Sequence, residues 1–330
     1  MIINKSCRLL LGIILAVSFL WLILRQITFE KIWKVLIGVD VDWVIAALLV
    51  FALGYACRIE RWRSMIKRDN PGLEWGRCAG PLLAGFAVNN VLPFRAGDAL
   101  RAFAFNKELG SSAGVIMATL FVERLLDLMM LLLLLGAAMV IFGLDNNQFA
   151  GIGAAALVLA ALTILLILLF PGFVTPIVLL IGRLVVRFAP GFGQKLFSEI
   201  NKSLSTLHHL AIGGTMFRLI LWSIVVWLAE GCVFWFFAMA LPDLAVPLAS
   251  WLALPMGTLA TMIPSTPGYI GTFDFFTAHA MATLGNDPAA AAAFALFVHA
   301  LLWLWPTLLG GFYLIIHHLK KQEKLKGTSK

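Results

Sequence analysis

The stretch VIMATLFVERLLDLMMLLLLLGAAMVIFGL, residues 115–144, sets the fold class of this chain. It is longer than the roughly 20 apolar residues that an α-helix needs to cross the hydrocarbon of a bilayer. Its only charged side chains are Glu123, Arg124 and Asp127. The stretch therefore predicts a membrane-spanning helix that carries charged groups at membrane depth.

The composition of the whole chain agrees with a membrane protein. Of the 330 residues, 61% are hydrophobic and 13% are charged, with a net charge of +8. A typical soluble domain is about half apolar and about a quarter charged, so this chain has too little polar material to cover a soluble globule. The same composition excludes a disordered chain, a collagen-like repeat and a disulfide scaffold.

Apolar stretches of spanning length recur along the chain and predict an all-α polytopic membrane protein with about six full transmembrane helices. The expected spans are residues 9–25, 42–57, 112–143, 149–170, 217–240 and 289–316. The first follows Lys5 and Arg8, and no small-residue cleavage motif comes after it. We therefore expect a retained helix there and not a signal peptide.

The positions of Lys and Arg predict the orientation, because the cytoplasmic loops of membrane proteins are enriched in these residues. With the N-terminus inside, 21 of the 25 Lys and Arg residues fall in cytoplasmic segments. Only Arg25, Lys31 and Lys34 fall outside. We expect a multi-pass protein of the cytoplasmic (inner) membrane with both termini in the cytoplasm.

Two further apolar stretches, residues 79–94 and 246–284, do not fit as simple spans. The first lies between two basic segments that must both be cytoplasmic, and it contains Pro81. The second must begin and end outside, and MIPSTPGYIG, residues 262–271, interrupts any continuous helix. We expect two oppositely oriented re-entrant hairpins and a possible inverted repeat, with a binding site where the broken helices meet.

These elements divide one integral membrane domain, residues 1–330, into successive segments. Residues 1–170 form the first half, which includes the cytoplasmic hairpin, and residues 171–212 form a cytoplasmic connector of amphipathic helices. Residues 213–316 form the second half, which includes the outside hairpin, and residues 317–330 form a basic cytoplasmic tail.

The first cluster of polar residues lies in NNVLPFRAGDALR, residues 89–101. Pro93 and Gly97 predict a turn, and Arg95, Asp98 and Arg101 share one stripe if a helix begins at residue 95. Two guanidiniums beside a helix N-terminus suit a phosphate group. The residues expected to bind a head group or phosphate are Arg58, Arg61, Asn89, Asn90, Arg95, Asp98 and Arg101. The alternative is a basic cytoplasmic turn with an Arg–Asp pair.

The second cluster consists of Glu123, Arg124 and Asp127, which are costly inside a membrane by roughly 2.5–3.5 kcal/mol each. The cluster keeps a net negative charge, and Arg58 or Arg61 is a candidate partner for it. We expect an intramembrane polar path made of Glu123, Arg124, Asp127, Glu230 and Asp274. The alternative is an internally neutralised pair that fixes helix packing.

The third cluster lies in PSTPGYIGTFD, residues 264–274, where exposed amides of a Gly/Pro turn suit an anion or a head group. Asp274 lies in an apolar segment and needs a cationic or hydrogen-bonding partner, and Glu230 and His299 are candidates for a proton relay. The residues assigned to re-entrant turns are Pro93, Gly97, Pro264, Thr266, Pro267, Gly268 and Gly271.

Motifs of common enzymes are absent from the sequence, including the Walker A, HExxH, GxSxG and Rossmann patterns. The four cysteines show no CxxC spacing. We therefore expect no catalytic residues, no cofactor, no metal ion and no nucleic-acid partner.

The three clusters together resemble a flippase-like membrane family named for the transmembrane part of lysylphosphatidylglycerol synthase. The resemblance rests on NNVLPFRAGDALRAF (89–103), FVERLLDL (121–128) and PSTPGYIGTFDFF (264–276), in this order and spacing. This chain has Asp98 and Asp274 where Glu is common in the family, and Tyr269 where Gly is common. It contains no stretch corresponding to the soluble aminoacyl-transferase domain of the fused members, so lysyl transfer is not expected.

The resemblance implies a membrane bundle with two re-entrant segments that handles lipids or lipid-linked head groups. We expect a flippase-like translocator of a phospholipid or of a lipid-linked phosphate, with anionic or polyprenyl-phosphate lipids as partners. The head group would pass a polar cleft formed by the hairpins and the Glu123 face. The alternatives are an intramembrane lipid-phosphate transferase or hydrolase, and a non-transporting partner of a lipid or polysaccharide biosynthesis enzyme.

Overall fold

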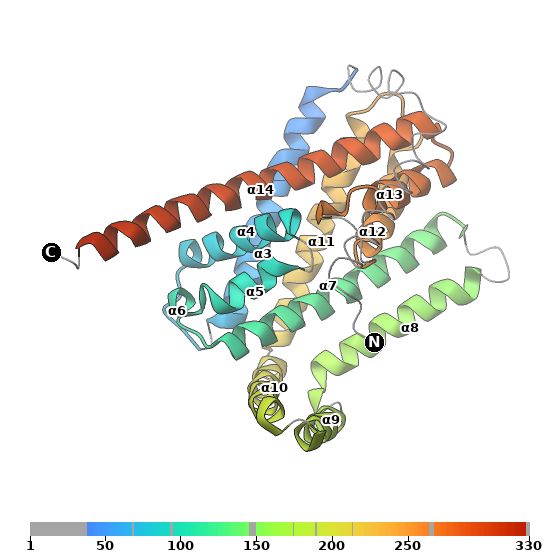
Figure 1. Cartoon of the computed structure of the whole chain (residues 1–330). Coiled ribbons are helices and arrows are strands. Elements are labelled where there is room, and N and C mark those ends of the chain that lie inside the picture. Colours follow the sequence, from blue (N-terminus) through green and yellow to red (C-terminus); the bar gives the residue numbers. More distant parts are fainter. Residues whose placement is uncertain are drawn as a thin grey trace. The chain divides into compact units, whose positions relative to one another are not determined.

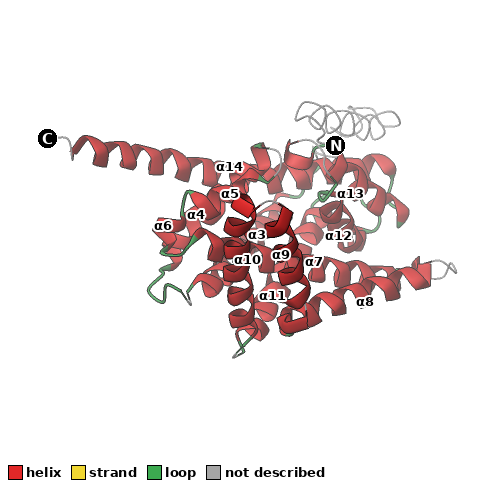
Figure 2. Cartoon of the chain, turned by 60° about the horizontal axis from the view of Figure 1, so that its bottom comes forward, coloured by secondary structure: helices red, strands yellow, loops and turns green. Residues whose placement is uncertain are grey.

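The computed structural model describes residues 38–67, 69–92, 95–144, 150–173, 175–188, 190–212, 214–263 and 267–327. The expected span 9–25 and the turn residues Pro93, Pro264 and Thr266 lie outside the described residues. Within the described ranges the regular structure is entirely helical, as Figures 1 and 2 show.

The helices follow the apolar pattern of the sequence closely. They are α3 (Val41–Ile66), α4 (Trp75–Val91), α5 (Ala96–Phe103), α6 (Asn106–Leu109), α7 (Ala113–Ile141), α8 (Ala150–Leu169), α9 (Thr175–Phe188), α10 (Pro190–Ala211), α11 (Thr215–Met239), α12 (Ser250–Ala260), α13 (Thr272–Thr283) and α14 (Pro288–Gly327). Short 3₁₀ turns precede α9, α12 and α13.

The structure contains helices long and apolar enough to cross a membrane, which confirms an all-α polytopic membrane protein. By length and composition they are Val41–Ile66, Ala113–Ile141, Pro171–Phe188, Thr215–Met239 and Pro288–Lys320. Pro171–Phe188 falls in the range for which we expected an amphipathic connector on the cytoplasmic surface. Its two arginines, Arg183 and Arg187, lie in its second half, and the residues of the helix before them carry no charged side chain.

The described residues separate into two compact units, each with segments from both halves of the sequence. Unit 1 comprises the described parts of Met1–Ala52, Ala79–Arg101 and Glu230–Lys330. Unit 2 comprises the described parts of Leu53–Cys78 and Ala102–Ala229.

The first expected hairpin has different bounds from residues 79–94. Helix α4 continues without a break to Val91 and contains Pro81 in its interior, and the returning limb is α5. The chain reverses between them, where Arg95 has a positive φ of 52°. An interior proline removes one backbone donor and kinks or breaks a helix. At Pro81 the helix is not broken.

The second expected hairpin consists of α12 and α13, which pack against one another. The chain between them contains a 3₁₀ turn at Pro267–Tyr269. Gly268, Tyr269 and Gly271 all have positive φ, at 70°, 60° and 85°. The backbone therefore reverses through left-handed conformations, which glycine adopts readily and tyrosine does not.

Glycines allow α4 to pack closely against its neighbours in unit 1. A Cβ added at Gly97 would lie 1.9 Å from the carbonyl oxygen of Gly85, so α5 approaches α4 through bare backbone. A Cβ added at Gly310 of α14 would lie 2.1 Å from the carbonyl oxygen of Leu83. The neighbouring Gly311 has nothing within 4 Å of an added Cβ.

The two adjacent glycines of α14 provide a test of this packing. We expect Gly310→Ala to destabilise the protein by about 1–3 kcal/mol, because the methyl group forces α14 away from α4. Gly311→Ala is expected to be neutral or stabilising by up to about 1 kcal/mol, since alanine is the better helix former. The midpoint of heat denaturation in detergent, followed by size exclusion, measures both. Equal midpoints for the two variants would contradict the packing described.

Candidate functional site

The last turn of α4 is tied to α14 in unit 1 by a set of hydrogen bonds around Asn90. Its side-chain amide donates to Thr307 Oγ1 at 2.9 Å and to the carbonyl oxygen of Trp303 at 3.3 Å. The indole Nε1 of Trp303 donates in return to the carbonyl oxygen of Asn90 at 3.2 Å. The end of the first hairpin limb is therefore satisfied by side chains of α14.

The break between α12 and α13 is fastened to the same helix by His299. Its Nε2 lies 2.8 Å from the carbonyl oxygen of Gly268, and its Nδ1 lies 2.7 Å from Asp274 Oδ1. The other carboxylate oxygen of Asp274 accepts the backbone N–H of Gly271 at 2.8 Å. Asp274 is 1% exposed, so the expectation that it needs a partner is confirmed, and His299 is that partner.

The two helix breaks therefore meet on α14 and enclose a small cavity of about 120 Å³. A Cβ added at Gly268 would lie 3.2 Å from the carbonyl oxygen of Asn90, which shows how closely the two breaks approach. The lining residues are Asn90, Thr261, Gly268, Tyr269, Phe273, His299, Leu302 and Trp303. We call this place, with Asp274, the hairpin junction.

Asp98 and Arg101 lie three residues apart on α5, as expected, and form the Arg–Asp pair that the alternative gave. Arg101 is 1% exposed and its Nη1 lies 4.0 Å from Asp98 Oδ1. Asn89 organises the turn, because its Nδ2 donates to Asp98 and its Oδ1 accepts the N–H of Gly97 at 2.8 Å. Gly85 leaves the room that the Arg101 side chain fills. Arg101 therefore belongs to the packing of the first hairpin and does not form an open phosphate clamp.

Arg95 precedes α5 and is not part of it, so the three residues expected on one stripe do not share a helix. Its side chain is half-buried, and the structure gives it no hydrogen bond or ion pair with another described residue. It directly precedes a helix N-terminus, where backbone N–H groups and the helix dipole favour an anion. Of the two arginines of this cluster, Arg101 is buried and Arg95 is half-buried.

The charged residues of α7 form a separate buried network within unit 2. Asp127 Oδ1 accepts from Arg61 Nη1 at 2.8 Å and from the indole Nε1 of Trp227 at 3.0 Å. Arg61 is 1% exposed and also donates to Ser223 Oγ at 3.0 Å. The suggestion that Arg58 or Arg61 supplies the missing cation is confirmed for Arg61.

The remaining charges of unit 2 lie close to this network. Arg124 Nη1 is 3.9 Å from Asp127 Oδ2, and Glu123 is 3% exposed. The guanidinium of Arg58 lies 5.3 Å from the ring centroid of Trp227, a cation–π contact. Arg58 and Arg61, which we expected to bind a head group, are thus engaged by side chains of the protein itself.

Glu230, a candidate from the sequence, is half-buried on α11 and is not among the residues that line the junction cavity. His279 is exposed on α13, where its ring stacks on that of Phe275. The sequence analysis missed Trp303 and Thr307. Their signal was the spacing of four that places them on one face of α14 with His299.

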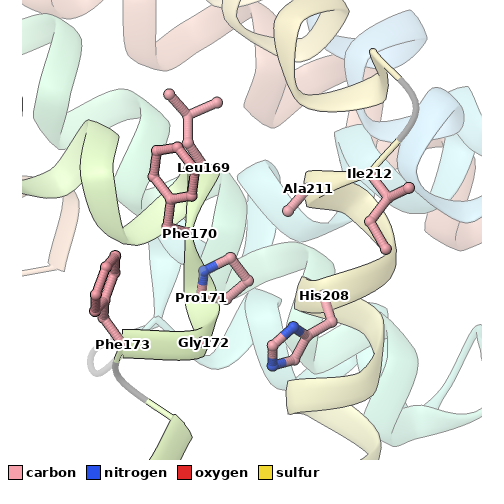
Figure 3. A pocket seen from close by; sticks show the side chains of 8 residues that line it. All are labelled: Leu169, Phe170, Pro171, Gly172, Phe173, His208, Ala211 and Ile212. Carbon is pink, nitrogen blue, oxygen red and sulfur yellow. The ribbon is translucent and has the colours of Figure 1, made fainter.

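A second cavity, of about 450 Å³, lies in unit 2 and is shown in Figure 3. Its lining is mainly apolar and comprises Leu169, Phe170, Pro171, Gly172, Phe173, His208, Ala211 and Ile212. His208 Nε2 lies 2.8 Å from Thr175 Oγ1. No group of three or more His, Cys, Asp or Glu side chains that could hold a metal ion occurs among the described residues.

Comparison with known proteins links the chain to one family. The model of the family described as Lysylphosphatidylglycerol synthase TM region matches residues 9–310. UPF0104 membrane protein PH1989 of Pyrococcus horikoshii is 22% identical over 99% of this chain and 100% of its own length. UPF0104 membrane protein MJ1595 of Methanocaldococcus jannaschii is 23% identical over 96% of this chain and 97% of its own length.

One relative is named for an enzymatic activity, and this chain matches only part of it. Glycosyltransferase AglD of Haloferax volcanii is 26% identical over 90% of this chain, and the match covers 52% of AglD. This chain therefore spans about half the length of that relative.

The buried network of unit 2 predicts a large cost for removing one partner. We expect Asp127→Ala to destabilise the protein by about 3–5 kcal/mol, because it leaves the Arg61 charge and the Trp227 N–H without their acceptor. Glu74→Ala removes one partner of an exposed pair with Arg77 and is expected to change stability by less than about 0.5 kcal/mol. Heat denaturation in detergent compares the two.

The double variant Arg61→Met/Asp127→Leu checks the reason for that cost. It removes both charges and fills the space with apolar side chains, so it is expected to regain much of the stability that Asp127→Ala loses. A double variant no more stable than Asp127→Ala would contradict a cost that arises from an unpaired buried charge.

Proposed function

This chain belongs to the family described as Lysylphosphatidylglycerol synthase TM region, and from that premise we propose that it translocates a phosphate-bearing lipid across the cytoplasmic membrane. The lipid class is a phospholipid or a polyprenyl-phosphate-linked head group. The observation that carries the proposal is the hairpin junction, where two helix breaks meet on a cavity whose wall includes the polar side chains of Asn90, Thr261 and His299. Broken helices that meet inside a membrane are typical of substrate sites in transporters.

The proposal gives Arg95 the first contact with the head group. It is the half-buried cation that precedes α5, and it has no ion pair with another described residue. Arginine suits phosphate because its planar guanidinium donates two parallel hydrogen bonds to the phosphate oxygens. The positive-inside pattern of Lys and Arg supports a cytoplasmic position for this turn and for both termini.

The hairpin junction gives the head group a polar surface next to the turn that Asn89 organises. Asn89 holds the turn after α4, and the adjacent Asn90 lines the cavity. Two neighbouring residues of one helix therefore connect the Arg95 turn to the junction. Only the polar head group needs hydrogen-bonding partners from the protein when it leaves water. The apolar chains of the lipid need none and would stay in the bilayer.

A second candidate is a non-transporting or catalytic role in building a lipid-linked glycan. The name of the Haloferax volcanii relative, a glycosyltransferase, favours it. Under this reading the purified chain would change the lipid chemically or would act only together with an enzyme. Mass spectrometry of lipids incubated with the purified protein separates this candidate from translocation, because a translocator leaves the lipid mass unchanged.

Leaflet exchange in liposomes tests the proposal. Liposomes that contain the wild-type protein should exchange fluorescent phospholipid or polyprenyl-phosphate lipid between leaflets several-fold faster than empty ones. Arg95→Ala should lose most of that gain, because it removes the cation proposed to hold the phosphate. Arg77→Ala is the matched control, since Arg77 is an exposed arginine of α4 paired with Glu74 at 3.6 Å.

The control variant is expected to exchange lipid at the wild-type rate. Equal rates for empty liposomes and for liposomes with the wild-type protein would overturn the proposal. Equal losses in Arg95→Ala and Arg77→Ala would overturn the role of Arg95.

A further inference from the structure

The hydrogen bonds of His299 determine how many protons it shares with Asp274. A backbone carbonyl has no hydrogen to give, so Nε2 must donate to Gly268 across 2.8 Å. The contact of 2.7 Å between Nδ1 and Asp274 Oδ1 also needs a hydrogen, on either the nitrogen or the oxygen. When both contacts are made as hydrogen bonds, the pair holds one proton more than a neutral histidine beside an ionised aspartate.

Loss of that proton would break one of the two contacts of His299. With a single hydrogen on the ring, a nitrogen lone pair faces either the Asp274 carboxylate or the Gly268 carbonyl, and both contacts are repulsive. The pair would also carry a net negative charge where Asp274 is 1% exposed. An unpaired charge in such surroundings is costly, so the contact must open.

We propose that Asp274 and His299 form a proton-binding site, and that the bound proton fastens the turn 267–271 to α14. With the proton bound, His299 joins the turn to α13 through Gly268 and Asp274. With the proton lost, the remaining ring N–H stays with the ionised Asp274 carboxylate, because a hydrogen bond to a charged acceptor is the stronger one. The bond to Gly268 then opens and the turn is released from α14.

The backbone of the turn is strained, so loss of the His299 bond would change its conformation. Tyr269 has a φ of 60°, a conformation that costs a non-glycine residue free energy and persists when its surroundings hold it. The His299 bond to the adjacent Gly268 is one of those restraints. Its loss allows the strained turn to relax, which changes the wall of the junction cavity that Gly268 and Tyr269 form.

Among the described residues that line the cavity or pack on the pair, Asp274 and His299 are the two titratable groups in direct contact. Helices α4 and α12 line the cavity with Asn90 and Thr261, neither of which titrates. The turn contributes the phenol of Tyr269, and Phe273 packs on the His299 ring at 4.6 Å between centroids. Helix α11 packs on Phe273 through Phe234, and its acid Glu230 lies one turn earlier. The remaining histidine of α13, His279, is exposed.

This inference is independent of the proposed function, because the proton binds whether or not a lipid moves. Its test therefore contains no transported lipid. Hydrogen–deuterium exchange of the full chain in nanodiscs, followed by mass spectrometry, reports how tightly the peptide 267–276 is held. The measurement is made over a range of pH values for the wild type, Asp274→Asn and His279→Gln.

Asp274→Asn allows the turn to be held without the extra proton. Its amide oxygen can accept from Gly271 and its amide nitrogen can donate to His299 Nδ1, so a neutral histidine satisfies all the bonds. The ratio of wild-type to Asp274→Asn exchange cancels the intrinsic pH dependence of amide exchange. We expect this ratio to be close to one in acid and to rise several-fold in alkali, with His279→Gln behaving as the wild type.

A ratio that stays constant with pH would overturn the proposal. A second readout applies if Asp274→Asn does not fold. Nitrogen NMR of histidine-labelled wild type, with His299 assigned from His299→Gln, should show both ring nitrogens protonated, or a proton shared with Asp274, while the turn is held. A His299 ring that is a single neutral tautomer without a shared proton at every pH would also overturn it.

Discussion

Hydrocarbon offers no hydrogen bonds, so every helix break and every charge inside this protein needs a partner from the protein itself. The hairpin junction follows from that requirement. The last turn of α4 and the turn 267–271 both leave backbone carbonyls outside a helix, and α14 supplies Trp303 and His299 to satisfy them. One face of a single helix thereby joins both breaks, and the wall of the cavity between them contains these groups.

In unit 2 the same requirement is met by a buried network of hydrogen bonds. Asp127 is bonded by Arg61 and Trp227, and Ser223 takes a further donor of Arg61. This arrangement satisfies a buried acid on several sides, which favours a fixed structure. The junction of unit 1 differs, because it keeps a cavity beside the His299 ring and a proton that can be removed.

Much of the fold followed from hydropathy, because α3, α7, α11 and α14 are each apolar over a spanning length. The partner of the acidic cluster also followed, since a net charge at depth demands a counter-charge. The choice between Arg58 and Arg61 did not, because both lie at the same end of α3 and only the packing separates them. The break at Gly268 and the need of Asp274 for a partner were likewise visible in the residue types.

The burial of Arg101 was not predictable, because the space it fills exists only where α5 meets α4 at Gly85. The sequence predicted that Arg101 lies on an exposed face of a helix, whereas the structure buries it between the two helices of the first hairpin. For the same reason Arg95 could not be singled out beforehand, since its position outside α5 depends on the left-handed backbone at that residue. When the surroundings of a side chain come from distant segments, its burial cannot be predicted from the sequence pattern.

The central claim is that the protein holds a phosphate-bearing lipid through Arg95. Native mass spectrometry of the protein extracted from membranes tests it most directly, because it weighs the lipid that remains bound. The account predicts a phosphate-bearing lipid on the wild type and on Arg77→Ala, and its loss from Arg95→Ala. The same lipid retained on Arg95→Ala, or no phosphate-bearing lipid on the wild type, would contradict it.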